Sequence, residues 1–409
     1  MRPTTALAAA GALASGVSAE NYLGFNSGAT LADRSAKFKA DFEAEFKTAQ
    51  GLENAPGTFN AVRLYTNIQA YSQDDPIEAF EAAIDTKTKL LLGIWTSGTD
   101  NIDKELSALK KAIDTYGKKF TDLVIGMSIG SEDLYRDSET GHINKAGIGA
   151  GPDVIVKFIK EYKEAVANTA LKGVPIGHVD TWDAWTNGTN KAVVNAVDWV
   201  GVDEYPYYET GKGNAIENSG TLFDRAYNLV ENAVGGKPIW VTETGWPSTG
   251  PKWDQAVASV ENAKYYWDEI GCRQLFNKVP TFWYTLRDSN PDNEMKFAIT
   301  KNLSTKPLFD LTCPTKFDTP TGSATTASPS STGGSSTGVS TPGSTPTGGS
   351  GSGSGSGNGS GSGTGTDGDD ASGTGGASPV ETGSAHLGKS ISAAAVVGLA
   401  MVAGVFALF

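Results

Sequence analysis

Eight short apolar or β-branched runs recur along the first three quarters of the chain. Their mean spacing is about 37 residues, which is enough for a strand and a crossover helix in each repeat. We expect each run to be a strand. The runs are Tyr22–Asn26, Phe59–Thr66, Leu90–Trp95, Leu123–Ile129, Ile176–Val179, Trp199–Asp203, Ile239–Thr242 and Thr281–Leu286.

The segments between these runs repeat apolar residues at helical spacing. Leu31–Gln50 places three phenylalanines four residues apart, beginning at Phe38, and Ile102–Tyr116, Val154–Leu171 and Leu222–Val234 behave similarly. Alternating strands and helices predict a parallel sheet covered by helices, an α/β fold. Eight such units in about 300 residues favour a closed (β/α)8 TIM barrel. An open doubly wound sheet is the alternative.

Composition limits the folded part of the chain. Of the 65 residues from 321 to 385, 49 are Gly, Ser or Thr, and none is aromatic. Such a segment buries too little apolar surface to offset the entropy of ordering it. We therefore expect one folded domain over residues 20–320 and a disordered Ser/Thr/Gly-rich linker over 321–383.

Both ends of the chain have the composition of targeting signals. A basic start, an alanine-rich apolar run and Val17-Ser18-Ala19 predict a secretory signal peptide over residues 1–19. The charge-free run Ile391–Phe409 follows small residues and a polar spacer, the pattern of a glycosylphosphatidylinositol (GPI) attachment signal. We expect lipid attachment at Gly383 and removal of residues 384–409; a tail-anchored helix is the alternative. The expected location is the outer face of the cell membrane and the cell wall.

Charge and motifs exclude several functions. The formal net charge is −13, whereas a nucleic-acid partner calls for a basic surface. No glycine-rich dinucleotide or phosphate-binding motif follows the first run. His142 and His178 lack metal-ligand spacing to a cysteine or a second histidine. We therefore expect no nucleic acid, no cofactor and no metal.

Two glutamates follow predicted strands. Glu132 comes three residues after the fourth run, in Gly130-Ser131-Glu132-Asp133, and Glu243 comes directly after the seventh. In a barrel of parallel strands the chemistry lies at the carboxyl ends, and strands three apart can aim their last residues at one point. Two carboxylates that meet there indicate glycosidic-bond cleavage. A surface salt bridge for each glutamate is the alternative.

The segment Glu243-Thr-Gly-Trp-Pro-Ser-Thr-Gly, with the apolar run before it, resembles the signature of glycoside hydrolase family 17, the β-1,3-glucanases. The resemblance extends over roughly residues 20–312 and includes Tyr22-Leu-Gly-Phe-Asn, Arg63-Leu-Tyr and Tyr205-Pro-Tyr. It implies a (β/α)8 barrel, retention of configuration and no cofactor. Carried over, it makes Glu132 the proton donor and Glu243 the nucleophile.

The linker and lipid signal make the chain similar to fungal cell-wall members of this family. We therefore expect a monomeric enzyme that hydrolyses internal β-1,3-glucosidic linkages of cell-wall β-glucan. One alternative is a β-1,3-glucanosyltransferase that uses the same covalent intermediate. The other is a wall protein that binds glucan without cleaving it.

One residue beside the catalytic pair departs from the family pattern. The family usually has Asn directly before the acid/base, where this chain has Ser131. That serine is expected to reach the sugar 2-hydroxyl through a water, or to be compensated by Asp133. A nearby ionised Glu243 should raise the pKa of Glu132 and keep it protonated.

Four aromatic residues near strand ends are candidate substrate contacts. We expect Tyr205 to donate a hydrogen bond to the nucleophile. Tyr65, Trp246 and Trp283 offer flat faces for sugar rings. Ordinary core packing is the alternative for each of the four.

The sequence contains two cysteines and three N-glycan acceptor sequons. In a secreted chain, Cys272 and Cys313 can form a single disulfide; two free buried thiols are the alternative. Asn187, Asn302 and Asn358 begin acceptor sequons for N-glycans.

Overall fold

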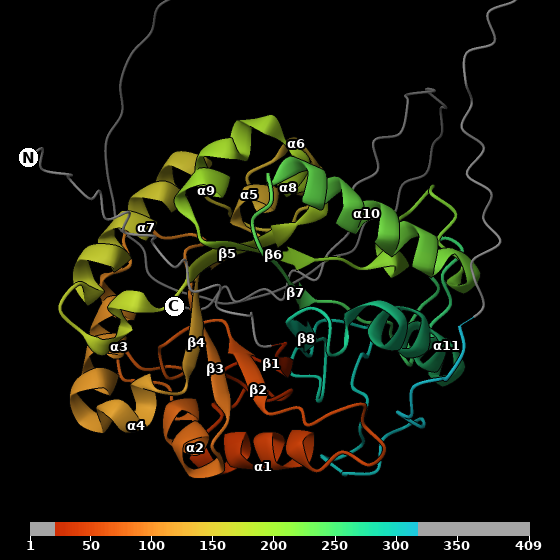
Figure 1. The fold of residues 1–409 in the computed structure, drawn as a ribbon, viewed down its shortest axis with the longest axis horizontal. Helices are drawn as coiled ribbons and strands as arrows, with labels where there is room; N and C mark the ends of the chain where they lie inside the picture. Colours follow the sequence, from red (N-terminus) through yellow and green to blue (C-terminus); the bar gives the residue numbers. More distant parts are fainter. Residues whose placement is uncertain (1–20, 318–409) are drawn as a thin grey trace, which may run out of the picture. The chain divides into compact units, whose positions relative to one another are not determined.

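The computed structural model describes residues 21–317 (Figure 1). The predicted signal peptide (1–19), linker (321–383) and GPI propeptide (384–409) lie outside the described residues, as do Gly383 and Asn358. Between residues 21 and 317, no helix is long and apolar enough to cross a membrane.

Eight parallel strands form a closed barrel in chain order. The first strand pairs with both the second and the eighth, which closes the ring. Each predicted run overlaps one strand, so the predicted (β/α)8 barrel is confirmed. The strands are β1 (Leu23–Ser27), β2 (Ala61–Leu64), β3 (Lys89–Ile94), β4 (Val124–Ser131), β5 (Ile176–Thr181), β6 (Trp199–Asp203), β7 (Ile239–Glu243) and β8 (Thr281–Trp283).

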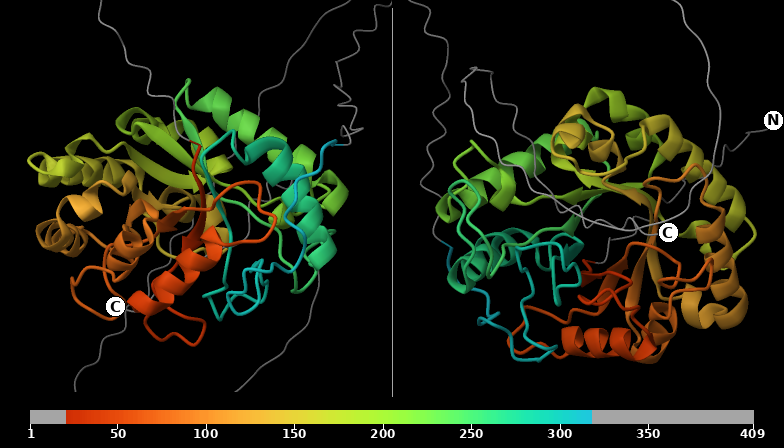
Figure 2. Two further views of the ribbon diagram at one scale, coloured as in Figure 1. Left: turned by 60° about the horizontal axis from the view of Figure 1, so that its bottom comes forward. Right: turned by 180° about the vertical axis from the view of Figure 1, so that it is seen from behind.

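The helices lie outside the ring of strands, as the views in Figures 1 and 2 show. They are α1 (Lys39–Gln50), α2 (Ala79–Thr86), α3 (Asp103–Tyr116), α4 (Lys118–Thr121), α5 (Asp133–Arg136), α6 (Glu139–Ile143), α7 (Pro152–Val166), α8 (Trp182–Thr186), α9 (Lys191–Ala196), α10 (Ser219–Ala233) and α11 (Val260–Tyr266). A π-helical segment, Trp267–Leu275, continues α11, and short 3-10 turns span Ala170–Gly173, Gly188–Asn190, Pro206–Tyr208 and Ile216–Asn218.

The first helix is shorter than its periodicity predicts. It begins at Lys39 rather than Leu31, because Phe38 has an extended backbone and is the residue that precedes the first turn. The Phe38 side chain is 54% exposed, whereas Phe42 and Phe46 are buried. The preceding loop instead turns Lys37 inward, where its ammonium pairs with Glu45 at 2.7 Å.

The seventh helix also ends early. It stops at Val166, and Leu171, the predicted last residue, belongs to a separate 3-10 turn. Leu171 is nevertheless fully buried. The apolar spacing therefore identified the buried side chain correctly but not the break in the helix.

The barrel interior is filled by apolar side chains toward its amino-terminal end. A small cluster of buried residues, separate from the large core under the helices, includes Trp199, Trp240 and Phe282. The indole rings of Trp199 and Trp240 stack with centroids 4.4 Å apart. Gly177 makes room for this pair, because a Cβ there would lie 2.3 Å from the Trp199 ring. Because these side chains fill the amino-terminal part of the barrel interior, a substrate-sized cavity has room at the carboxyl end.

One disulfide ties the end of the described chain to the barrel. Cys272, in the π-helical segment, is joined to Cys313, with Cα atoms 5.5 Å apart. This is the predicted pairing, and it joins two residues that are 41 positions apart in the sequence.

Removing the disulfide should destabilise the fold without abolishing it. In the chain-entropy model, a loop of this length contributes about 4 kcal/mol. We expect the double variant Cys272→Ser/Cys313→Ser to melt roughly 5–10 °C below the wild type in calorimetry. Wild-type protein reduced before the scan should melt like the variant. Equal melting temperatures for oxidised wild type and variant would contradict the expected contribution.

Candidate active site

A cavity opens at the carboxyl ends of the strands. The space between its walls, including the part open to solvent, is about 550 Å³, and the walls come from residues at or just after β1, β2, β3, β4, β7 and β8. Glu132 and Glu243 both line it, so the structure brings the two predicted carboxylates into one cavity. The remaining lining residues are Asn26, Gly28, Tyr65, Trp95, Ser131, Arg136, Tyr284, Thr285, Ser289 and Asn290.

Three donors hold the Glu243 carboxylate. Arg63 and the Tyr65 hydroxyl each donate to Oε1 at 2.6 Å, and the Tyr205 hydroxyl donates to Oε2 at 2.8 Å. The Glu243 side chain is almost fully buried. Hydrogen bonds and a guanidinium at this distance favour the ionised carboxylate and fix its rotamer.

Arg63 is the centre of this arrangement, and sequence reasoning gave it no role. It is buried on β2, where it donates to Glu243, to Asn26 Oδ1 at 2.9 Å and to Ser131 Oγ at 2.9 Å. Asn26 is fixed in turn by donating to the backbone carbonyls of Thr242 and Phe282 at 3.0 Å. A lone arginine inside the apolar strand Ala61–Leu64 was the sequence signal that could have identified it.

Glu132 lines the same cavity as Glu243 but has different neighbours. Its Oε2 accepts from Arg136 at 3.0 Å, and Oε1 has no hydrogen-bond partner among residues 21–317. Burial raises the pKa of Glu132 to about 8; Arg136 opposes this shift, and the charge of Glu243 adds to it. Because burial outweighs the ion pair, we take Glu132 as protonated near neutral pH. The pKa of Glu132 is therefore raised, as predicted, but burial contributes more to the rise than the neighbouring Glu243 carboxylate does.

Arg136 connects Glu132 to the rim of the cavity. Besides Glu132, it donates to Ser97 Oγ at 2.9 Å and to the backbone carbonyl of Ser131. Its guanidinium lies 5.3 Å from the centre of the Trp95 ring. Trp95 thus lines the cavity as an aromatic side chain that the sequence analysis placed on a strand but not in the site.

Ser131 lines the cavity next to Glu132, where it accepts from Arg63. Asp133 does not compensate for its short side chain. The fully buried Asp133 carboxylate accepts from the hydroxyls of Thr96 and Ser97 at 2.7 Å and from the backbone N–H of Ser131 at 2.9 Å. These bonds hold Asp133 inside the protein, so that part of the expectation is wrong.

The four aromatic candidates divide into two groups. Tyr65 and Tyr205 both donate to Glu243, although Tyr65 was expected only as a flat surface. Trp246 and Trp283 are each 2% exposed and do not line the cavity. The Trp246 indole packs against Tyr207, while Trp283 packs against Trp267. The expectation that these two indoles face sugar rings is therefore wrong.

A third buried carboxyl lies near the pair. Asp203 ends β6 and is level with Glu243 in the pairing of β6 with β7. It accepts from Thr242 Oγ1 at 2.6 Å, and its other oxygen has no hydrogen-bond partner in the described chain. Burial and the charge of Glu243 raise the pKa of Asp203. The site thus contains more acid groups than the two that the sequence indicated.

The other predicted positions lie away from the cavity. Asn187 and Asn302 are exposed, which leaves both sequons accessible. His142 is exposed on α6, while His178 is buried on β5. Within residues 21–317, no group of three His, Cys, Asp or Glu side chains could hold a metal ion.

The chain is similar in sequence to fungal glycoside hydrolases. Residues 27–302 match the BtgE/BtgC glycoside hydrolase domain. The chain is 51% identical over 294 residues to the probable glucan endo-1,3-beta-glucosidase eglC of Aspergillus niger, and 52% identical over 293 residues to the protein of that name from Emericella nidulans. Each alignment covers 71% of this chain, but only 63% and 62% of those relatives. The chain thus matches less than two thirds of their length.

Solved structures show the same barrel. An active-site mutant of the Rhizomucor miehei beta-1,3-glucanosyltransferase in complex with laminaritriose superposes with a TM-score of 0.55 and 25% identity, covering 70% of this chain and 96% of that one. An endo-laminarinase from Formosa, at 15% identity and a TM-score of 0.53, covers 68% of this chain and 83% of that one and supports the fold alone. Together with the domain match and the Aspergillus relatives, these findings show that the chain belongs to the BtgE/BtgC glycoside hydrolases, within the fungal glycoside hydrolase family 17.

Proposed function

We propose that this protein is a retaining glycoside hydrolase that cleaves internal β-1,3-glucosidic linkages of β-glucan. The observation that carries the proposal is the unlike pair of glutamates in one cavity. Three donors stabilise Glu243 as a carboxylate, while burial keeps Glu132 protonated. A carboxylate beside a protonated acid is the pair that glycosidic-bond cleavage requires, and the resemblance to glycoside hydrolase family 17 implies that this pair works with retention.

The first step forms a covalent intermediate. A Glu243 carboxylate oxygen attacks the anomeric carbon, and the bond from that carbon to the bridging oxygen breaks. The Glu132 proton moves to the departing oxygen, which leaves as the 3-hydroxyl of the next sugar. Of the two Glu243 oxygens, Oε2 accepts a single hydrogen bond, from Tyr205, and retains a lone pair for the attack.

The second step returns the enzyme to its starting state. Glu132, now ionised, takes a proton from water as the water oxygen bonds to the anomeric carbon. In the same step the bond between that carbon and Glu243 breaks, and the product has the configuration of the substrate. Arg136 stabilises the ionised Glu132 between the two steps.

The substrate class is supported by the relatives. The Aspergillus proteins bear the name glucan endo-1,3-beta-glucosidase, and the Rhizomucor miehei protein was solved with laminaritriose, a β-1,3-linked trisaccharide. That structure is of a glucanosyltransferase, which favours transfer to a sugar hydroxyl as the second candidate function. Both reactions share the first step and differ in the group that attacks the intermediate.

Product analysis tests the proposal. We expect purified full-length protein to release reducing sugar from laminarin and to leave a β-1,6-glucan intact. With a defined β-1,3-oligomer at low concentration, shorter oligomers should dominate. Oligomers longer than the substrate as the main product would replace hydrolysis by transfer. Binding of laminarin without release of sugar would reduce the protein to a glucan-binding function.

Removing the Tyr205 hydroxyl should slow turnover moderately. A hydrogen bond to a charged group contributes roughly 1.5–3 kcal/mol, so we expect Tyr205→Phe to lower kcat on laminarin about 10–100-fold. Tyr207→Phe is a matched control, because the Tyr207 hydroxyl donates to the Pro251 carbonyl and not to Glu243. Equal activity of the two variants would show that the bond to Glu243 has no catalytic effect.

We also propose that the enzyme works outside the cell and is held at the membrane by a lipid anchor. The composition of residues 1–19 and 384–409 supports this proposal. Phosphatidylinositol-specific phospholipase C should then release active protein from intact membranes. Protein that stays on membranes after this treatment, with Phe409 found by mass spectrometry, would indicate a tail-anchored helix instead.

A further inference from the structure

The acid/base candidate has an unusual backbone. Glu132 has φ 57° and ψ 25°, in the left-handed region that residues other than glycine rarely adopt. Such a conformation is strained and persists only where surrounding contacts enforce it. The contacts that enforce it here come from β5, the neighbouring strand.

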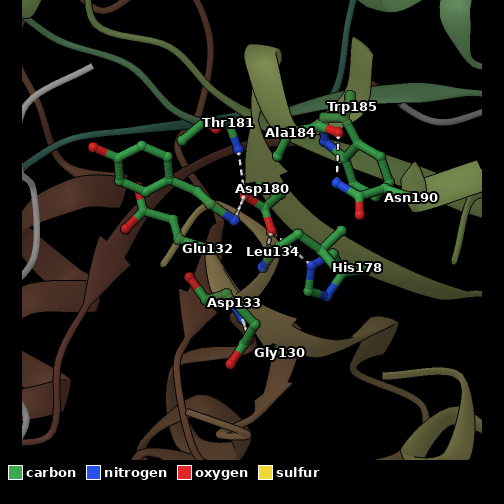
Figure 3. A network of polar contacts seen from close by, with 12 residues as sticks. Gly130, Glu132, Asp133, Leu134, His178, Asp180, Thr181, Ala184, Trp185 and Asn190 are labelled. Atoms are coloured by element: carbon green, nitrogen blue, oxygen red, sulfur yellow. Dashed lines mark hydrogen bonds and ion pairs between the residues drawn. The ribbon is translucent and has the colours of Figure 1, made fainter. Parts of the chain in front are cut away.

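Asp180 on β5 holds the turn that follows Glu132 (Figure 3). Its carboxylate is fully buried and accepts from the backbone N–H groups of Leu134 at 2.9 Å and Tyr135 at 3.2 Å. It also accepts from the N–H of Thr181 at 2.9 Å. The backbone N–H of Glu132 itself donates to the Val179 carbonyl at 2.8 Å. Two adjacent residues of β5 therefore fix the turn that begins at Glu132.

His178 in turn holds Asp180. The Nε2 atom lies 2.9 Å from Asp180 Oδ2, and Nδ1 lies 2.6 Å from the Ile129 carbonyl oxygen. A carbonyl oxygen can only accept, so Nδ1 carries a proton; the carboxylate favours a proton on Nε2 as well. Burial opposes a charged ring, but the hydrogen bond and charge of Asp180 outweigh it and raise the pKa of His178. The imidazolium thus balances the buried Asp180 carboxylate and links it to β4, three residues before Glu132.

This network has little room to rearrange. A Cβ on Gly130 would lie 2.9 Å from His178 Cε1 and 2.4 Å from Asp133 Oδ2. The Trp185 ring packs edge-on against the imidazole, with centroids 5.6 Å apart. Side chains packed this tightly keep Asp180 in one position.

The fixed turn carries both the acid and its partner. Residues 132–136 include Glu132 and Arg136, whose guanidinium donates to Glu132 Oε2. A shift of this turn would therefore move the proton donor and the charge beside it together. A misplacement of about 1 Å can cost about 100-fold in rate.

We propose that Asp180, held by His178, is a positioning residue that fixes the acid/base Glu132 against the substrate. The proposal rests on the function proposed above, because it needs Glu132 to be the proton donor. A change at Asp180 should therefore slow the cleavage of only those substrates whose leaving group requires a proton. Neither Asp180 nor His178 lines the cavity, so neither touches the substrate.

The test compares two substrates in the full chain. A β-1,3-glucan oligomer has a poor leaving group, whereas 2,4-dinitrophenyl β-laminaribioside releases a phenolate that needs no proton. We expect Asp180→Asn to lower kcat on the oligomer about 30–100-fold, with KM changed less than about threefold. The rate of bond cleavage in the aryl substrate should stay within about threefold of wild type.

Asp183→Asn is the matched control. Asp183 lies three residues further along the chain and accepts from the Thr181 hydroxyl, with no hydrogen bond to residues 130–136. It should retain wild-type rates on both substrates. If Asp180→Asn does not fold, His178→Gln serves instead, since glutamine keeps a donor for Asp180 and loses the bond to Ile129; we expect the same pattern with a smaller loss.

Glu132→Gln separates the failure of this proposal from that of the proposed function. If Glu132→Gln loses oligomer cleavage selectively, but Asp180→Asn and His178→Gln lose both substrates equally or neither, the positioning role is overturned and the function stands. If Glu132→Gln is itself not selective, Glu132 is not the acid, and both proposals fall.

Discussion

Glycine in place of Glu243 should nearly abolish the cleavage of laminarin. We expect kcat to fall at least about 10⁴-fold, because the variant lacks the group that bonds to the anomeric carbon. Folding should be retained, since the space vacated by the Glu243 carboxylate adjoins the cavity, and water that enters it can accept from Arg63, Tyr65 and Tyr205. Thermal melting and a reducing-sugar assay on the same preparation check both expectations.

Azide gives this prediction a positive signal. In Glu243→Gly a small anion can occupy the vacated space and attack the anomeric carbon of an activated aryl glycoside. We expect azide or formate to restore part of the aryl glycoside turnover, and azide to yield the α-glycosyl azide. Glu243→Gln is the matched control, because its amide fills the space and should not respond. Near-native activity of either variant without added anion would contradict the assignment.

Replacing Glu132 by glutamine should have the second largest effect, and one that depends on the substrate. General acid catalysis contributes about 10²–10⁴-fold, so kcat/KM on a β-1,3-glucan oligomer should fall by that factor. Formation of the intermediate from 2,4-dinitrophenyl β-laminaribioside should change little, because its leaving group needs no proton.

The dependence of oligomer cleavage on pH should show the ionisation of Glu132. Glu132 acts in its protonated form, and burial raises its pKa to about 8. Activity on the oligomer should therefore hold below pH 8 and fall about tenfold per pH unit above it. In Glu132→Gln this alkaline decline should disappear for the oligomer, whereas cleavage of the aryl substrate, whose leaving group needs no proton, should lack it in the wild type as well. A wild-type decline centred near pH 4.5 would contradict the buried, protonated acid.

The strands were predictable because parallel barrel strands are buried on both faces and appear as nearly continuous apolar runs. Each of the eight runs overlaps a strand, although β2 covers only Ala61–Leu64 of the predicted Phe59–Thr66. Helix starts were harder to predict. The loop before α1 continues the helical spacing, yet tertiary contacts of Lys37 with Glu45 decide its path.

The site was predictable where function coincides with a strand end. Glu132 and Glu243 stand out because each follows an apolar run. Arg63 and Asn26 lie within strands, and their roles depend on partners 37 and 180 residues away in the sequence. No local pattern identifies such partners.

The two tryptophans show the limit of position along a strand. Both follow or end strands, as predicted, but side chains there alternate between the barrel interior and the helices. Trp246 donates to the Val257 carbonyl and packs among Tyr207 and Tyr266, away from the cavity. Trp95 shares their position at a strand end and does line the cavity.

Trapping the covalent intermediate tests the account most directly. A 2-deoxy-2-fluoro laminaribioside with a dinitrophenyl leaving group should form the intermediate and release it slowly, since fluorine destabilises the charged transition states of both steps. We expect intact-mass spectrometry to show one added glycosyl unit and peptide sequencing to place it on Glu243. A label on any other residue, or time-dependent inactivation without a covalent adduct, would contradict the central claim that Glu243 is the nucleophile of a retaining enzyme.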